Sequence, residues 1–188
     1  MKLSQNLTLA EACRSETAKR KHLDNTPDEL TLDNLKLTAE KIFQPIRDHF
    51  KKPIYVSSMF RCERLNGFVG GSRNSKHITG QAIDIDNDGT DVSNKDIFEF
   101  IKDNLKFDVL IWEYGDDLPN WVHCTYVEGL NRGLVFHNST DHGLQEYKNK
   151  KPKKVKYEQK EKKVQRNKTR SVSTGEIRGV SDTSRNDS

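Results

Sequence analysis

The sequence predicts an α+β fold, with a small, mainly antiparallel sheet and helices packed on one side of it. Residues 32–50 place apolar side chains on one face at helical spacing. Two later segments, at residues 82–86 and 121–126, alternate apolar and polar side chains as strands do, and residues 108–114 are also predicted to form a strand. Helices and short strands in one chain of 188 residues, long enough for one domain and a tail, indicate this fold class.

The first fifty residues are predicted to be helical with breaks. Thr8 and Glu11 have the spacing of a capping box at the start of a helix, and residues 14–20 continue that helix or form a short second one. Residues 24–27, which end in proline, interrupt the helical pattern. Pro45 is expected to kink the long helix or to start a new turn in it.

The rest of the domain is predicted to consist of strands and two shorter helices. Strands are expected at residues 53–58, 82–86, 108–114, 121–126 and 131–137, with the third and fourth paired. Residues 64–66 are expected in a short helix, and Ser93 is expected to cap a helix from residue 94 to about residue 105. Residues 69–75 are predicted to form a loop that leads to His77.

Potential metal ligands concentrate in residues 58–89. His77 and Asp84 lie seven positions apart, and Asp86 is expected to share a strand face with Asp84. Imidazole and carboxylate are good zinc ligands, and His123 on a later predicted strand offers a third. A catalytic zinc takes three protein ligands and keeps one position for water. Taken singly, each of these residues also fits the description of an ordinary histidine or loop-end acid.

Two further residues are candidates for catalysis. Glu113, ten residues before His123, is the candidate general base, because such a base must reach water without binding the metal itself. The alternative for Glu113 is a strand-surface glutamate. Arg61 is the candidate for stabilising an oxyanion, and it is also suited to pin a substrate carboxylate or to form a structural salt bridge.

Three residues are expected around this group. Ser75 and Asp86 are candidates for accepting the second N–H of a metal-bound imidazole, although Asp86 equally fits the start of an acidic turn at residues 86–91. Trp121, together with Trp112, is expected to line the cleft or to fill the core beneath it.

These motifs resemble those of a known family. Residues 75–84 read SxHxxGxAxD, and Trp-Val-His at residues 121–123 supplies a second motif. Residues 60–66 and 69–72 match the way the family enters its first motif. The combination resembles the D-Ala-D-Ala carboxypeptidase/Hedgehog-like zinc peptidases, the fifteenth family of metallopeptidases, which includes phage endolysins that cut bacterial peptidoglycan. The similarity runs from roughly residue 3 to residue 143.

The resemblance implies a Hedgehog/D-Ala-D-Ala peptidase-like fold, in which the long helix packs on the sheet. It implies one zinc per chain, held by His77, Asp84 and His123, with Glu113 as the base. It also implies hydrolysis of peptide bonds in peptidoglycan stem peptides, by an endopeptidase or D,D-carboxypeptidase, for cell-wall lysis or remodelling. The alternative is a catalytically silent, Hedgehog-like zinc-containing binding module of the wall or virion, which the retention of Glu113 and Arg61 argues against.

The chain is predicted to divide into a zinc peptidase domain at residues 1–146 and a basic, disordered tail at residues 147–188. The tail is rich in lysine and poor in apolar residues, so it cannot bury enough surface to offset ordering entropy. Its lysines suit contact with anionic polymers. Nucleic acid is not the expected partner, because no interleaving of aromatic and basic residues supports it.

The start of the chain lacks the apolar run of a signal peptide, and no stretch of about twenty apolar residues is present. The protein is therefore expected to be made in the cytoplasm, as a monomer without a transmembrane segment. Action on peptidoglycan then requires another route to the wall, and release by a phage lysis system fits this requirement.

Overall fold

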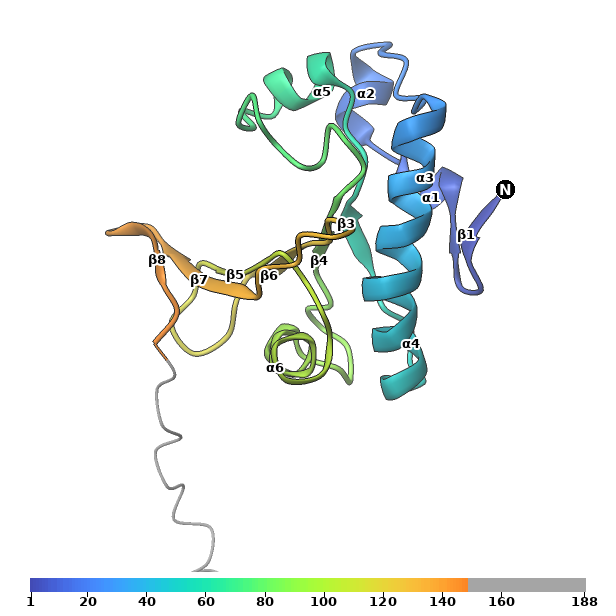
Figure 1. Cartoon of the computed structure of the whole chain (residues 1–188). Coiled ribbons are helices and arrows are strands. Elements are labelled where there is room, and N and C mark those ends of the chain that lie inside the picture. The colour runs from blue at the N-terminus through green and yellow to red at the C-terminus, as the bar shows by residue number, and fades with distance from the viewer. Residues whose placement is uncertain (149–188) are drawn as a thin grey trace, which may run out of the picture. The chain divides into compact units, whose positions relative to one another are not determined.

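A six-stranded sheet forms the centre of residues 1–148, the part of the chain that the computed structural model describes (Figure 1). Its strands, in sheet order, are β3 (Val56–Ser58), β4 (Ala82–Ile85), β6 (Trp121–Thr125), β5 (Val109–Glu113), β7 (Leu134–Ser139) and β8 (Gly143–Glu146). Neighbours are antiparallel except β5 and β7, which run parallel. The mainly antiparallel α+β fold is thereby confirmed, as is the pairing of the 108–114 and 121–126 segments.

The chain begins with a two-stranded ribbon that the sequence did not predict. The elements of this region are β1 (Lys2–Ser4), β2 (Leu7–Thr8), α1 (Leu9–Ala12) and α2 (Glu16–Arg20). The strands are too short for a readable alternation of side chains, which is why they were missed. α1 begins at the predicted capping box, in which the Thr8 hydroxyl accepts from the backbone N–H of Glu11. α2 is a separate short helix that Ser15 caps.

The long helix is continuous (Figure 1). Its hydrogen-bond pattern changes ahead of Pro45. It consists of α3 (Glu29–Thr38), the π-helical stretch η1 (Ala39–Phe43) and α4 (Gln44–Phe50). In η1 the backbone N–H of Gln44 donates to the Ala39 carbonyl, five residues back. Pro45 has no N–H and its ring crowds the carbonyl four residues earlier, so a wider turn before it lets the helix continue. Asp28 caps the helix, which begins at Glu29, three residues before the predicted start.

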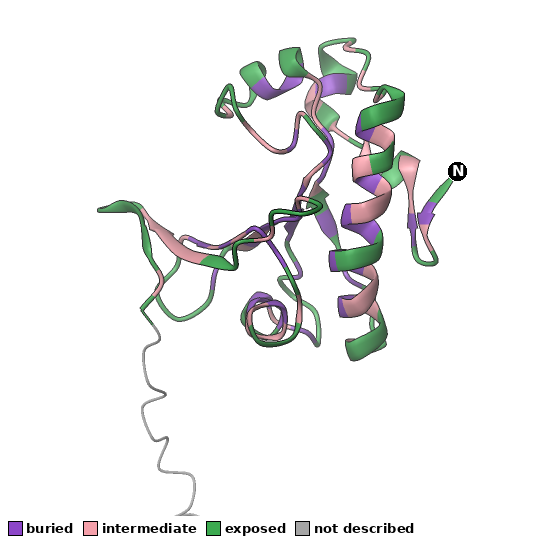
Figure 2. Ribbon diagram, viewed as in Figure 1, coloured by how far each residue is buried: buried purple, intermediate pink, exposed green. Residues whose placement is uncertain are grey.

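One hydrophobic core joins the long helix, the sheet and α6 (Asn94–Asn104), which begins at the predicted Ser93 cap. Figure 2 shows the buried residues along the inner faces of these elements. The fully buried side chains include Leu35, Ile42, Ile46, Ile83, Ile85, Ile97, Phe98, Ile101 and Leu110. Trp112 belongs to this core, since its ring meets that of Phe98 edge-on at 5.2 Å between centroids. Residues on the other face of the sheet are therefore available for a site.

The strand β4 differs from the half-buried strand that its alternating pattern predicts. All four of its residues are buried, because β4 lies between β3 and β6 and both of its faces are covered. The expectation that Asp84 and Asp86 share one strand face is wrong, since β4 ends at Ile85 and Asp86 is exposed in the following turn. Only one acid of the motif is therefore buried in the sheet.

The end of the domain also departs from the prediction. The last predicted strand, at residues 131–137, is β7, which begins and ends later, and β8 follows it as an additional strand. Residues Met1–Tyr147 form one compact unit, in which the Tyr147 ring lies 5.0 Å from that of Phe98. The predicted tail lies outside the described residues except for its first two positions, and the boundary at residue 146 stays a prediction. None of the helices in residues 1–148 is long and apolar enough to cross a membrane.

Candidate metal centre

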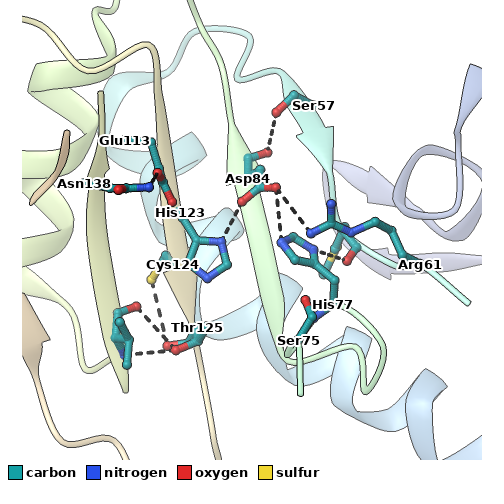
Figure 3. A network of polar contacts seen from close by, with 12 residues as sticks. Ser57, Arg61, Ser75, His77, Asp84, Glu113, His123, Cys124, Thr125 and Asn138 are labelled. Carbon is teal, nitrogen blue, oxygen red and sulfur yellow. Dashed lines mark hydrogen bonds and ion pairs between the residues drawn. The ribbon is translucent and has the colours of Figure 1, made fainter. Parts of the chain in front are cut away.

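The sheet brings two of the predicted ligands directly opposite each other. Asp84 on β4 pairs with His123 on β6, and Ile111 on β5 continues the same row. Paired residues on neighbouring strands point to the same face. His77 reaches this face from the loop that precedes β4 (Figure 3). Strand pairing therefore assembles residues that are 39 positions apart in the sequence.

The Asp84 carboxylate lies between the two imidazoles (Figure 3). Its Oδ2 atom is 3.1 Å from His77 Nε2, and its Oδ1 atom is 2.7 Å from His123 Nδ1. Burial would raise the pKa of Asp84, but the two imidazoles beside it outweigh burial and hold the pKa below the ordinary value. The three potential ligand atoms all lie within 4.8 Å of one another. This arrangement is close enough for one metal ion to contact all three side chains.

The tautomer of His77 is determined by a backbone contact. His77 Nδ1 lies 2.7 Å from the carbonyl oxygen of Met59. A carbonyl oxygen only accepts, so Nδ1 carries the proton and donates it, and in the neutral ring Nε2 keeps its lone pair. Nε2 is buried and has no hydrogen-bond partner among the described residues, although Asp84 is near. A metal ion would satisfy this buried nitrogen, and the N, N, O donor set suits zinc.

The loop between His77 and Asp84 is held against the long helix. Gly80 has φ +70°, and a Cβ at this position would lie 2.6 Å from the Thr31 carbonyl oxygen of α3. The Thr38 hydroxyl donates to the Gly80 carbonyl at 3.0 Å. The glycine of the SxHxxGxAxD motif therefore permits both a left-handed backbone and close contact with α3, and that contact positions the loop that carries His77.

Glu113 lies on the same face, toward β7. It pairs with Trp121 on β6, which lies two residues from His123 on the same strand and therefore on the same face. Its Oε2 atom accepts a hydrogen bond from Asn138 Nδ2 of β7 at 2.8 Å. Burial raises the pKa of Glu113, and the Asn138 hydrogen bond opposes that rise only in part. A raised pKa makes a carboxylate a stronger base, as general-base catalysis requires.

Arg61 lies on the opposite side of the cluster, next to β3. Its Nη2 atom is 4.0 Å from Asp84 Oδ2, and its backbone N–H donates to the His77 carbonyl at 3.2 Å. Its Nε atom is buried and has no hydrogen-bond partner within residues 1–148. Burial lowers the pKa of the guanidinium, and the charge of Asp84 partly restores it. Arg61 and Glu113 thus lie on either side of the proposed metal ligands.

A model of the Peptidase M15 family matches residues 5–125, more than half of the chain. The chain belongs to the peptidase M15 family. The matched range contains the three clustered residues as well as Arg61 and Glu113, and it ends before β7. M15 enzymes are metallopeptidases that are typically zinc-dependent, and His77, Asp84 and His123 form a group that could hold the metal. A comparison with curated proteins found no match to the chain.

The remaining predicted residues of the M15 site are less directly placed. The Ser75 hydroxyl accepts from the His77 backbone N–H at 3.4 Å, so it contacts the loop rather than an imidazole. Asp86 Oδ1 accepts from the Asp88 N–H and from Asn94 Nδ2, which places its carboxylate in the acidic turn. Trp121 lies next to Glu113, and its ring is 5.3 Å from that of Tyr114.

Sequence reasoning missed two contacts of this M15 site. Met59 contacts His77 through its backbone carbonyl, and because every residue has such a carbonyl, the sequence does not identify this contact. Asn138 lies in a strand whose parallel pairing with β5 was not foreseen, beyond the residues of both motifs. The predicted terminal strand ended at residue 137, so no sequence pattern pointed to Asn138.

Proposed function

We propose that this M15 peptidase is a zinc-dependent hydrolase of peptide bonds in the stem peptides of bacterial peptidoglycan. The observation that carries the proposal is the fixed tautomer of His77. Its Nε2 lone pair faces Asp84 and lies near His123, while Glu113 lies on the same face of the sheet. The three residues of the cluster would hold one zinc per chain.

When bound, zinc would polarise the scissile carbonyl and lower the pKa of a water molecule. Glu113 accepts a proton as the water oxygen bonds to the carbonyl carbon. The same carboxyl group then returns the proton to the leaving nitrogen as the C–N bond breaks. Asn138 holds the Glu113 side chain during both transfers, through the 2.8 Å hydrogen bond to Oε2.

Arg61 supports the reaction by its fixed positive charge. Negative charge develops on the carbonyl oxygen during attack, and a preorganised cation lowers the energy of that state. The guanidinium is held near Asp84, and its partly buried position strengthens its electrostatic effect. Loss of Arg61 is therefore expected to affect kcat more than zinc binding.

The substrate class is tested by digestion of purified muropeptides, followed by mass spectrometry, with and without a chelator. Hydrolysis of the stem peptide that stops with the chelator and returns with zinc supports the proposal. The products also distinguish an endopeptidase from a D,D-carboxypeptidase. Zinc binding without any hydrolysis would instead support the silent binding module, and hydrolysis that the chelator leaves intact would contradict the zinc mechanism.

A further inference from the structure

A cavity of about 350 Å³ lies beside the metal cluster, on its β3 side. One part of its wall consists of residues 14–17, between α1 and the first turn of α2, and another consists of Ser57 and Ser58 of β3. Arg61 lines the cavity and also lies 4.0 Å from Asp84 Oδ2. Arg61 therefore borders both the cavity and the metal cluster, so a substrate residue held in the cavity would lie near a bond cleaved at that cluster.

The cavity wall carries more positive than negative charge. Arg14 and Arg61 contribute two guanidinium groups, against the single carboxylate of Glu16. Hydrogen bonds with Thr8, and to a lesser degree the charge of Arg14, lower the pKa of the nearby Glu11, but Arg14 forms no ion pair within residues 1–148. The buried Nε atom of Arg61 has no hydrogen-bond partner there. A buried donor without a partner lowers stability. An anionic acceptor in the cavity would have Arg14 as its cationic partner.

Part of the cavity lining is apolar. Phe60, Leu65 and Val69 complete its lining. The volume lies at the lower end of the range of about 300–1,000 Å³ that is usual for small-molecule sites. The cavity therefore suits one side chain rather than a stretch of polymer. An aliphatic arm would contact these apolar side chains, and a carboxylate at its end would reach Arg14.

We propose that this cavity is the specificity subsite of the peptidase. It binds a substrate residue adjacent to the scissile bond whose aliphatic side chain ends in a single carboxylate, and Arg14 selects that carboxylate through charge-assisted hydrogen bonds. The presence of Glu16 disfavours ligands with several negative charges. This inference rests on the proposed peptidase function and adds the class of substrate residue to it.

The kinetic test compares two muropeptides that differ only in this side chain, as a free carboxylate or as its carboxamide. The wild-type protein is expected to show a kcat/KM about tenfold higher for the carboxylate, as expected for a charge-assisted hydrogen bond. In Arg14→Gln that ratio should fall to about one. Lys19→Gln removes a positive charge from α2, outside the cavity lining, and should keep the wild-type ratio. An unchanged ratio in Arg14→Gln would overturn the proposal.

A binding test separates this subsite from the proposed peptidase activity. Glutarate monoamide carries one carboxylate on an aliphatic arm, and glutaramide is its uncharged counterpart. In NMR titrations of the full chain, the monoamide should shift the signals of residues 14–17 and Arg61, and glutaramide should not. These shifts without any peptide hydrolysis would retain the subsite and reject the peptidase. Hydrolysis without these shifts, or shifts that persist in Arg14→Gln, would reject the subsite alone.

Discussion

His77 Nδ1 lies 2.7 Å from the carbonyl oxygen of Met59, and this contact leaves Nε2 as the nitrogen that faces Asp84. A ring with the opposite tautomer would present an N–H to the cluster and could not bind a metal ion there. The backbone between β3 and α5 (Glu63–Phe68) therefore fixes the tautomer of His77 that metal binding requires, independently of a bound metal ion.

Substitution of His77 should abolish metal binding. The wild-type protein is expected to hold one zinc per chain by elemental analysis, and His77→Ala should hold much less, because two ligands bind zinc weakly. His142→Ala is the matched control, since His142 is exposed and lies in the turn between β7 and β8, at the far edge of the sheet. Equal zinc content in wild type and His77→Ala would show that the metal binds elsewhere.

Glu113→Gln should remove turnover while leaving zinc and fold intact. The amide keeps the size of the side chain but cannot accept the proton of the attacking water. Loss of a general base typically lowers the rate about 10²–10⁴-fold. Rates on muropeptides, zinc content and Tm should be measured together, with the exposed Glu146→Gln as control. Loss of zinc in Glu113→Gln would identify Glu113 as a ligand and reopen the assignment of Asp84.

The pH dependence of activity should respond to Asn138. Glu113 works as the deprotonated base, and burial raises its pKa above the ordinary value of 4.5. Asn138 stabilises the carboxylate and so opposes this rise. In Asn138→Leu the pKa of Glu113 should rise further, so the acidic limb of the kcat/KM profile should move to higher pH. Activity should be lost at mildly acidic pH and partly recovered at higher pH. A limb at the wild-type position would show that Glu113 does not set it.

Gly80→Ala should destabilise the protein more than Gly89→Ala. Both glycines have positive φ, which costs a non-glycine residue about 1 kcal/mol or more. A Cβ at Gly80 also meets the Thr31 carbonyl at 2.6 Å, whereas nothing lies within 4 Å of one at Gly89. We expect a loss of about 3 kcal/mol for Gly80→Ala from denaturant unfolding, because overpacking adds to the backbone strain. Equal losses would show that α3 does not confine this loop.

Removal of the residues after Lys148 should leave the chemistry intact. The lysine-rich composition of this segment predicts an accessory role, in contact with anionic wall polymers. The truncated chain should cleave soluble muropeptides at the wild-type rate and cleave intact walls more slowly, with the difference shrinking at high salt. A truncated chain that fails to fold would move the domain boundary.

Local patterns were sufficient to predict much of this protein. The caps at Thr8 and Ser93 and the apolar stripe of residues 32–50 predicted helices that are present. These features depend on side chains within a few residues of one another, so the sequence displays them directly. The residue types of His77, Asp84 and His123 identified a possible metal site for the same reason, since ligand chemistry belongs to the side chain itself.

Only the tertiary structure decided how those side chains are held. The Met59 carbonyl that orients His77 belongs to the backbone, which is the same in every residue. Asn138 reaches Glu113 through a parallel strand pair, and Arg14 reaches the cavity beside Arg61 across 47 positions of sequence. Such contacts depend on strand order and register, which follow from the packing of the whole core rather than from any local pattern.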